Sequence, residues 1–320
     1  MTEEYTRADD LWFFDGSLII KAGQKVFRVY KAQLAARSTV FAAMIASETP
    51  QNQGGEFIDG VPVVVLHDAA DGVHVFLRAI FDSSYFMPFP EPAFLEDILA
   101  ILRLSHKYDV GYLHRRALQH LSTEFYSASI EEYLEYKKKT SHLKYRSNDA
   151  EEVSYGFAVI NAACEVGALW LLPRAYYDAC RRGFERLLFA LARGPNEGHV
   201  RTFLSGYHYL CEATLRAALG CLSGPVDLCP QPNSCKQLRD RWRFIVFQPP
   251  TSMPFTVLAQ MEELISPNGS LSHRFCVPCY ESLNSKGFRN CWNDLPSYFG
   301  LPGWPELNAM KEAAMNTGSS

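Results

Sequence analysis

Apolar and polar positions divide the first part of the chain into short strand-like runs and helical segments. In "LWFFDGSLII", two runs rich in β-branched and aromatic residues flank Asp15 and Gly16, a dipeptide typical of a hairpin turn. "KVFRVYK" predicts a third strand. "VPVVVLHD" predicts a buried strand, because its apolar positions follow one another without alternation. The pattern therefore indicates a small sheet near the start of the chain.

Helical spacing dominates the segments that follow the third strand. One or two turns are predicted from Lys31 to Ala36, and Ser38 offers its side chain as the cap of the next helix. Asp71 is predicted to cap a helix with apolar residues every three or four positions. Two further amphipathic helices follow, separated by the turn "KYDVGY". Helices packed around a small sheet give an α+β fold class.

The pattern changes beyond Ser127. The run "YLEYKKKTSHLKYRSNDAEEV" is charged and predicts a helix end and an exposed connection over residues 127–152. Apolar residues then recur at helical spacing and predict a mostly α-helical domain over residues 153–265, without a fixed-period repeat. Residues 266–320 form a tail rich in cysteine and aromatic residues, which we expect to dock on that domain and to fray from Asn308 onward. Its aromatic residues include Trp292, Tyr298, Phe299 and Trp304.

Length and charge narrow the class of protein. A chain of 320 residues with 48% hydrophobic residues can bury a sizeable core and favours two domains. A formal charge of -4 does not favour nucleic acid as a partner, and two short basic clusters are interpreted as solvated helix faces. They comprise Lys137, Lys138, Lys139, Lys144 and Arg146, and Arg239, Arg241 and Arg243. No apolar run is long enough to span a membrane and the first residues are acidic, so we expect an intracellular protein of the cytoplasm or nucleus.

Motifs of catalysis do not stand out. The sequence has no phosphate-binding glycine loop, no G-x-S-x-G elbow and no H-E-x-x-H. His67 and Asp68 are adjacent, but a strand end followed by a capped helix explains the pair equally well. His106 and His120 are interpreted as core or helix-surface residues. We therefore expect a protein without enzymatic activity.

Two stretches carry a resemblance to a known family. "LWFFDGSLII…VFRVYKAQLAARSTVFAAM" and "LRLSHKYDVGYLHRRAL" are similar to the start and the last two helices of the BTB/POZ domain, over residues 9–126. The variant that the chain most resembles occurs in many fungal proteins, with "WFFDG" at its start and an uncharacterised helical region after it. The positions that match the pattern are Asp10, Phe27, Leu34, Ala35, Ser38, Phe41, Leu102, Tyr108, Leu113 and Ala117.

The resemblance implies a scaffold or adaptor that works through protein partners. BTB domains self-associate or attach a client to a cullin-3 ubiquitin ligase, among other scaffolding roles. Only Met1 to Asp9 precede the domain, which does not favour a swapped dimer. The apolar-x-Glu triple of cullin-3 adaptors is matched here by Ala46, Ser47 and Glu48, with a methyl group where a larger side chain is wanted. The link of a client to a ubiquitin ligase or to a regulatory complex therefore stays open, and the loop motif does not support cullin-3 as the partner.

One loop is a candidate interaction surface. "DSSYFMPFPEP" places Tyr85, Phe86, Met87 and Phe89 in a short proline-bounded turn. These residues either pack inward against the second domain, which we favour, or anchor a protein partner, since aromatic and methionine side chains often do.

The nine cysteines include one pattern typical of a metal site. Cys276 and Cys279 form a C-x-x-C, whose spacing lets two thiolates face one metal ion. Further ligands could be Cys229 and Cys235, His273, or Cys291. Reduced structural thiols without a metal are the favoured interpretation, structural zinc is the alternative, and a redox pair lacks the βαβ context that it needs. A metal-dependent catalytic or nucleic-acid-binding C-terminal half is the alternative function to an interaction module.

Overall fold

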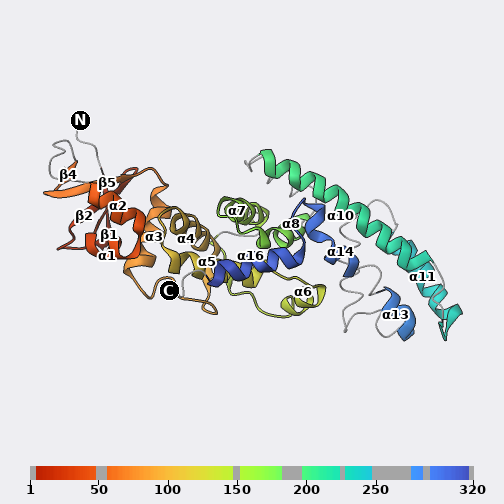
Figure 1. The fold of residues 1–320 in the computed structure, drawn as a ribbon. Helices are drawn as coiled ribbons and strands as arrows, with labels where there is room; N and C mark the ends of the chain where they lie inside the picture. Colours follow the sequence, from red (N-terminus) through yellow and green to blue (C-terminus); the bar gives the residue numbers. More distant parts are fainter. Residues whose placement is uncertain are drawn as a thin grey trace. The chain divides into compact units, whose positions relative to one another are not determined.

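The computed structural model describes residues 5–47, 56–146, 152–181, 197–223, 228–246, 275–283 and 289–316 (Figure 1). The chain divides into two compact units, and each unit is built from segments that are not continuous in the sequence. We call the first the sheet unit; it comprises Met1–Thr123, Ser141–Ser147 and Ala314–Ser320. The second, the helical unit, comprises Glu124–Thr140 and Asn148–Ala313. Together they confirm an α+β fold class, with a small N-terminal sheet and a helical C-terminal region.

The sheet unit contains a five-stranded mixed sheet in the order β1-β3-β2-β5-β4. Its strands are β1 (Thr6–Trp12), β2 (Leu18–Ala22), β3 (Lys25–Val29), β4 (Phe57–Ile58) and β5 (Val61–Leu66). Strand β2 is central and pairs antiparallel with β3 and parallel with β5. The strands predicted from "KVFRVYK" and "VPVVVLHD" are confirmed as β3 and β5.

The predicted hairpin at Asp15–Gly16 is wrong. Strand β1 pairs parallel with β3 and not with β2, so the hairpin is formed by β2 and β3, around Gly23. Gly23 has a φ of +55°, the left-handed region that this tight turn requires. The turn before β2 lies instead across β3, where Arg28 Nε donates to the Gly16 carbonyl at 2.8 Å. A Cβ on Gly16 would lie 2.8 Å from Arg28 Cγ, so glycine is needed there for close approach.

The helices of the sheet unit follow the predicted spacing. They are α1 (Lys31–Arg37), α2 (Thr39–Ser47), α3 (Ala70–Phe81), α4 (Leu95–Lys107) and α5 (Gly111–Phe125). Ser38 caps α2 as predicted, because its Oγ accepts from the Phe41 N–H at 2.9 Å. The prediction for Asp71 is wrong: Ala69 is the N-cap of α3, and Asp71 lies in the first turn, 3.3 Å from Lys25 Nζ.

Both faces of the sheet are apolar. Beneath the helices, Phe27, Phe41 and Phe76 are fully buried. On the other face a smaller cluster is covered by Tyr5 and Trp12. It comprises Ile19, Val26, Ile58, Val61 and Val63. Strand β5 is buried over most of both faces, which explains its continuous apolar run, and Val65 is its one exposed position.

The predicted exposed connection contains two regular elements. Helix α6 (Ile130–Tyr136) belongs to the helical unit, where Ile130 and Tyr133 are buried. The chain then returns to the sheet unit as β7 (Leu143–Lys144), which pairs parallel with β6 (Ala93–Phe94). Leu143 is buried, so this part of the segment belongs to the core of the sheet unit and is not a solvated linker.

The remainder of the helical unit is built from helices, as predicted. Described are α7 (Glu152–Glu165), the 3₁₀ helix η2 (Leu169–Leu171), α8 (Leu172–Arg181), α10 (Glu197–Ser223), α11 (Pro232–Val246), α13 (Val277–Leu283), α14 (Arg289–Asn293), α15 (Leu295–Tyr298) and α16 (Trp304–Asn316). The predicted helical stretch through residues 182–192 lies outside the described residues. Among the helices that the structure describes, none combines the length and the apolarity needed to cross a membrane.

The C-terminal aromatic residues pack within the helical unit. Trp292 stacks on Tyr133 at 4.6 Å between ring centroids, and Phe299 stacks on Tyr176 at 4.5 Å. Fraying from Asn308 onward is wrong for the described part, because α16 extends to Asn316 and the Tyr126 hydroxyl donates to Asn308 Oδ1 at 2.9 Å. The aromatic rings therefore supply much of the core of this unit.

Candidate functional site

The loop between α3 and β6 is fixed at its start by an Asp side chain. Asp82 Oδ1 accepts from the Ser84 N–H at 2.9 Å and from the Ser84 hydroxyl at 2.6 Å. These two hydrogen bonds to the ionised form lower the pKa of Asp82. The backbone N–H of Asp82 donates to the Arg78 carbonyl at 2.8 Å, which closes the last turn of α3. This loop, residues 82–92, which we call the aromatic loop, therefore leaves α3 in a defined direction.

Tyr85 is tied to a buried carboxylate. Its hydroxyl donates to Asp97 Oδ2 at 2.8 Å, and the guanidinium of Arg78 lies 4.0 Å from its ring centroid. Burial and the neighbouring Asp97 carboxylate raise the pKa of Tyr85, which therefore stays protonated and keeps donating. Asp97 is also held by Arg146, whose two terminal nitrogens each lie 2.6 Å from one carboxylate oxygen.

Arg146 is expected to stabilise the sheet unit, although its sequence neighbourhood predicts a solvated cluster. Replacing it by alanine removes the charged partner of the buried Asp97 and leaves the hydrogen bond from Tyr85, which should lower the free energy of unfolding by about 2 kcal/mol. Hydrogen exchange of the α4 amides measures the change. The control is Lys144→Ala, which removes an exposed lysine two positions away. Equal exchange rates in the two variants would contradict a stabilising Asp97–Arg146 pair.

Phe86 and Phe89 face the sheet unit's own side chains. Phe86 is 2% exposed, and its ring lies 5.3 Å from that of His120 on α5. Phe89 is half-buried, with its ring edge-on to His142 at 4.9 Å. The Phe86 carbonyl accepts from Arg116, and the Met87 carbonyl lies 2.9 Å from His120 Nε2. Burial lowers the pKa of His120, so the neutral ring donates this hydrogen bond at neutral pH.

Met87 is the most exposed of the four candidate residues. The residue is 44% exposed, and its neighbours Tyr85 and Phe86 anchor the loop by hydrogen bonds to Asp97 and Arg116. Of the four predicted interaction residues, the structure buries Phe86, half-buries Tyr85 and Phe89, and leaves Met87 accessible to a partner.

The histidines considered for catalysis have ordinary surroundings. His67 is exposed, and its neighbour Asp68 accepts from Lys107 Nζ at 2.7 Å and from the Tyr108 hydroxyl at 2.5 Å. His106 is exposed on α4, with its ring 5.3 Å from that of His114. These contacts join α4 to the end of β5 and explain Asp68 without a catalytic partner.

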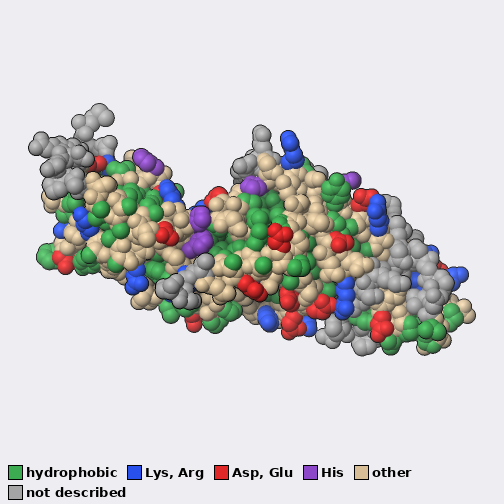
Figure 2. Space-filling model, in the orientation of Figure 1, with side chains coloured by type: hydrophobic (Ala, Val, Ile, Leu, Met, Phe, Trp, Pro, Cys, Tyr) green, Lys and Arg blue, Asp and Glu red, His purple; other side chains and the backbone are tan. Residues whose placement is uncertain are grey.

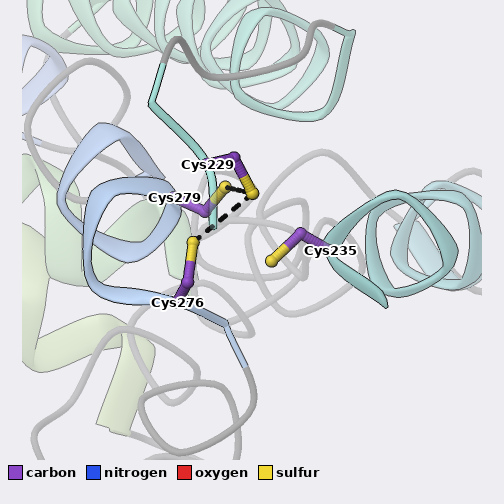
Figure 3. A group of neighbouring side chains, drawn as sticks. All are labelled: Cys229, Cys235, Cys276 and Cys279. Carbon is purple, nitrogen blue, oxygen red and sulfur yellow. Dashed lines mark hydrogen bonds between the residues drawn. The ribbon is translucent and has the colours of Figure 1, made fainter. Parts of the chain in front are cut away.

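Four cysteines of the helical unit converge on one point. The Sγ atoms of Cys229, Cys235, Cys276 and Cys279 all lie within 4.8 Å of one another, and Figure 3 shows their sulfur atoms pointing toward a common space. Cys229 Sγ lies 3.6 Å from Cys276 Sγ and 3.5 Å from Cys279 Sγ. Of the sequence candidates, Cys291 lies apart, 3.6 Å from the Ala213 carbonyl, and His273 is outside the described residues.

Local helix geometry places these thiols. Cys235 lies in the first turn of α11, where its N–H donates to the Gln231 carbonyl at 3.0 Å. Cys276 immediately precedes α13 and accepts from the Tyr280 N–H at 2.9 Å, so Cys279 is three positions further along the same helical turn. Residues three apart share a helix face, which turns both thiols of the C-x-x-C toward α11.

The cluster is set in an apolar shell that includes one charge. Phe275, Leu238 and Tyr280 pack around the thiols. Burial raises the pKa of the Cys235 and Cys279 thiols, whereas hydrogen bonds from Gln231 and the other thiols outweigh burial at Cys229 and lower its pKa. Arg239, predicted to be solvated, is 6% exposed and donates to Cys279 Sγ at 3.5 Å. Arg239 follows Cys235 by four positions on α11, and this helical spacing is the sequence signal that could have placed its side chain beside the cluster.

Four thiolates around one point can hold a soft divalent metal ion. Such a set is closed, because a catalytic zinc site keeps one position for water or substrate. The cluster therefore does not favour a catalytic C-terminal half. Figure 2 shows acidic and basic side chains interspersed over the described residues of one face, in line with the small net charge.

The N-terminal part of the chain is similar to a known protein family. The family model of the BTB/POZ domain matches residues 12–124. No curated protein and no solved structure matches the chain.

Proposed function

Residues 12–124 form a BTB/POZ domain, and from this premise we propose that the chain is an adaptor that recruits protein partners through this domain. The observation that carries the proposal is the family match, because BTB domains are typically non-catalytic interaction domains. In this proposal the helical unit supplies the second binding function of the adaptor.

The residues that match the family pattern make structural contacts between elements of the domain. Asp10 in β1 lies 2.8 Å from His74 Nε2 and 3.3 Å from Arg78 Nε, both on α3. Ser38 caps α2 and also donates to the Tyr108 carbonyl at 2.5 Å. These contacts join strand to helix and helix to helix. The residues of the family pattern therefore stabilise the domain, and we propose that partners bind to exposed side chains outside this pattern.

We place the partner contact at the aromatic loop. Met87 offers an accessible, polarisable side chain on a loop that is held in place by Phe86 and Tyr85, so little conformational freedom would be lost on binding. A partner with an apolar side chain inserted against Met87 fits this arrangement.

Replacing Met87 by aspartate should weaken partner capture by about tenfold or more without lowering stability, because a charge would be desolvated at the contact. The measurement is affinity purification of the full chain with quantification of the retained proteins, alongside thermal unfolding. Gln33→Asp is the control, since it adds the same charge at an exposed position of α1. Met87→Leu should retain binding.

Two outcomes would contradict this proposal at different levels. Equal retention by wild type and Met87→Asp would remove the loop from the interface. If a chain without residues 12–124 retained the same proteins as the full chain, the BTB/POZ domain would not be the recruiting domain.

Cullin-3 is not part of the proposal. Ala46 and Ser47 are exposed at the end of α2, but Glu48 lies outside the described residues, and the alanine supplies a methyl group where a larger apolar side chain is wanted. Self-association is a general property of BTB domains. Light scattering over a range of protein concentrations tests whether a second copy of the chain is a partner.

A further inference from the structure

We propose that Cys229, Cys235, Cys276 and Cys279 bind one zinc ion in a closed structural site of the helical unit. A family match to residues 12–124 does not cover these cysteines, so the proposal rests on the geometry and charge of the cluster alone.

The distances fit a single tetrahedral ion. Zinc–thiolate bonds of about 2.3 Å place neighbouring sulfur atoms about 3.8 Å apart. The Sγ separations of 3.5 and 3.6 Å around Cys229, with all four atoms within 4.8 Å, are close to this spacing. A disulfide would require about 2.05 Å between two of these sulfur atoms.

The buried Arg239 indicates that the cluster carries negative charge. A guanidinium is always protonated, and burying it is costly unless an anion lies beside it. Within the part of the chain that the structure describes, Arg239 donates a hydrogen bond to Cys279 Sγ. Neutral thiols are weak acceptors, whereas four thiolates around Zn²⁺ carry a net charge of about -2 that the guanidinium offsets. Arg239 thus favours the ionised, metal-bound form.

The site joins segments that are distant in the sequence. Cys229 and Cys276 are 47 positions apart, yet their thiols meet between the start of α11 and the start of α13 (Figure 3). Among the residues that the structure describes here, the apolar cluster around the site is small, with Cys235, Phe275 and Cys279 as its buried members. Zinc would supply the stabilisation that so few apolar side chains do not, since binding energy of a structural metal is folding energy.

Metal analysis of the full chain, purified without added zinc, tests the proposal. Wild type should contain one zinc per chain, Cys276→Ser should lose it, and Cys291→Ser should keep it, because Cys291 lies outside the cluster. Cobalt substitution should give thiolate-to-metal charge transfer and the ligand-field bands of a tetrahedral site. Absence of zinc in wild type, full occupancy in Cys276→Ser, or a disulfide among the four cysteines of freshly purified protein would overturn it.

A second variant keeps the test valid if Cys276→Ser fails to fold. Arg239→Met should bind zinc about tenfold or more weakly, as expected when a group that contacts a metal ligand is removed. Lys236→Met is the matched control, because it removes an exposed positive charge from the same helix. Chelator titration of both variants measures the affinity. Equal affinities would show that Arg239 does not support a thiolate site and would contradict the charge argument.

Discussion

Replacing Phe41 by alanine should lower the free energy of unfolding of the sheet unit by about 3–5 kcal/mol. Phe41 is fully buried and stacks on Tyr108 at 4.6 Å between ring centroids. Tyr108 is held in turn by Phe76 at 5.9 Å and by its hydroxyl bond to Asp68. The neighbours of the lost ring are therefore fixed, and the cavity cannot collapse.

Hydrogen exchange of β2 and β3 amides measures this loss, because their opening requires unfolding of the sheet unit. Phe14→Ala is the matched control: the same substitution at a residue that is 89% exposed should change stability by less than about 0.5 kcal/mol. A loss below about 1 kcal/mol for Phe41→Ala would show that α2 contributes little to the core of the domain.

A comparable loss is expected in the helical unit from Trp292→Ala, about 3–5 kcal/mol. Trp292 is 3% exposed, stacks on Tyr133 and meets Tyr177 edge-on at 5.2 Å. Its Nε1 donates to the Ser127 carbonyl at 3.0 Å, and its own carbonyl accepts from Trp304 Nε1 at 2.9 Å. One ring thus joins the tail to α6 and α8.

Trp292→Phe separates packing from hydrogen bonding. It keeps an aromatic ring but leaves the Ser127 carbonyl without its donor, which should cost about 1–3 kcal/mol. Exchange of α8 amides reports on both variants. If alanine and phenylalanine gave equal losses, the hydrogen bond and not the ring stack would be the main contribution of Trp292.

Local sequence patterns predicted the central strands β2, β3 and β5 and the helices of the sheet unit, but neither the short strands β4, β6 and β7 nor the pairing of β1. The Asp15–Gly16 dipeptide has hairpin chemistry, yet β1 pairs with β3, because the turn around Gly16 crosses Arg28 instead of folding back. This contact depends on tertiary structure, which propensity does not contain. The pairing of Leu143 with the sheet unit could not be predicted either, because Leu143 lies in a charged segment and its strand partner Ala93 is distant in the sequence.

The candidate sites show the same division between local and distant information. The C-x-x-C spacing indicated the first half of the cysteine cluster, whereas the fold was needed to show that Cys229 and Cys235 join it and that Cys291 does not. In the aromatic loop, composition identified the four residues. Only the positions of Asp97, Arg146 and His120 decide which of them are buried and which is exposed.

The most direct test of the recruiting role of the BTB/POZ domain is hydrogen exchange of the full chain, alone and with a co-purified partner. We expect slower exchange in the bound state within residues 12–124, with the largest change in the loop that contains Met87. Slower exchange confined to the helical unit, with residues 12–124 unchanged, would contradict this role.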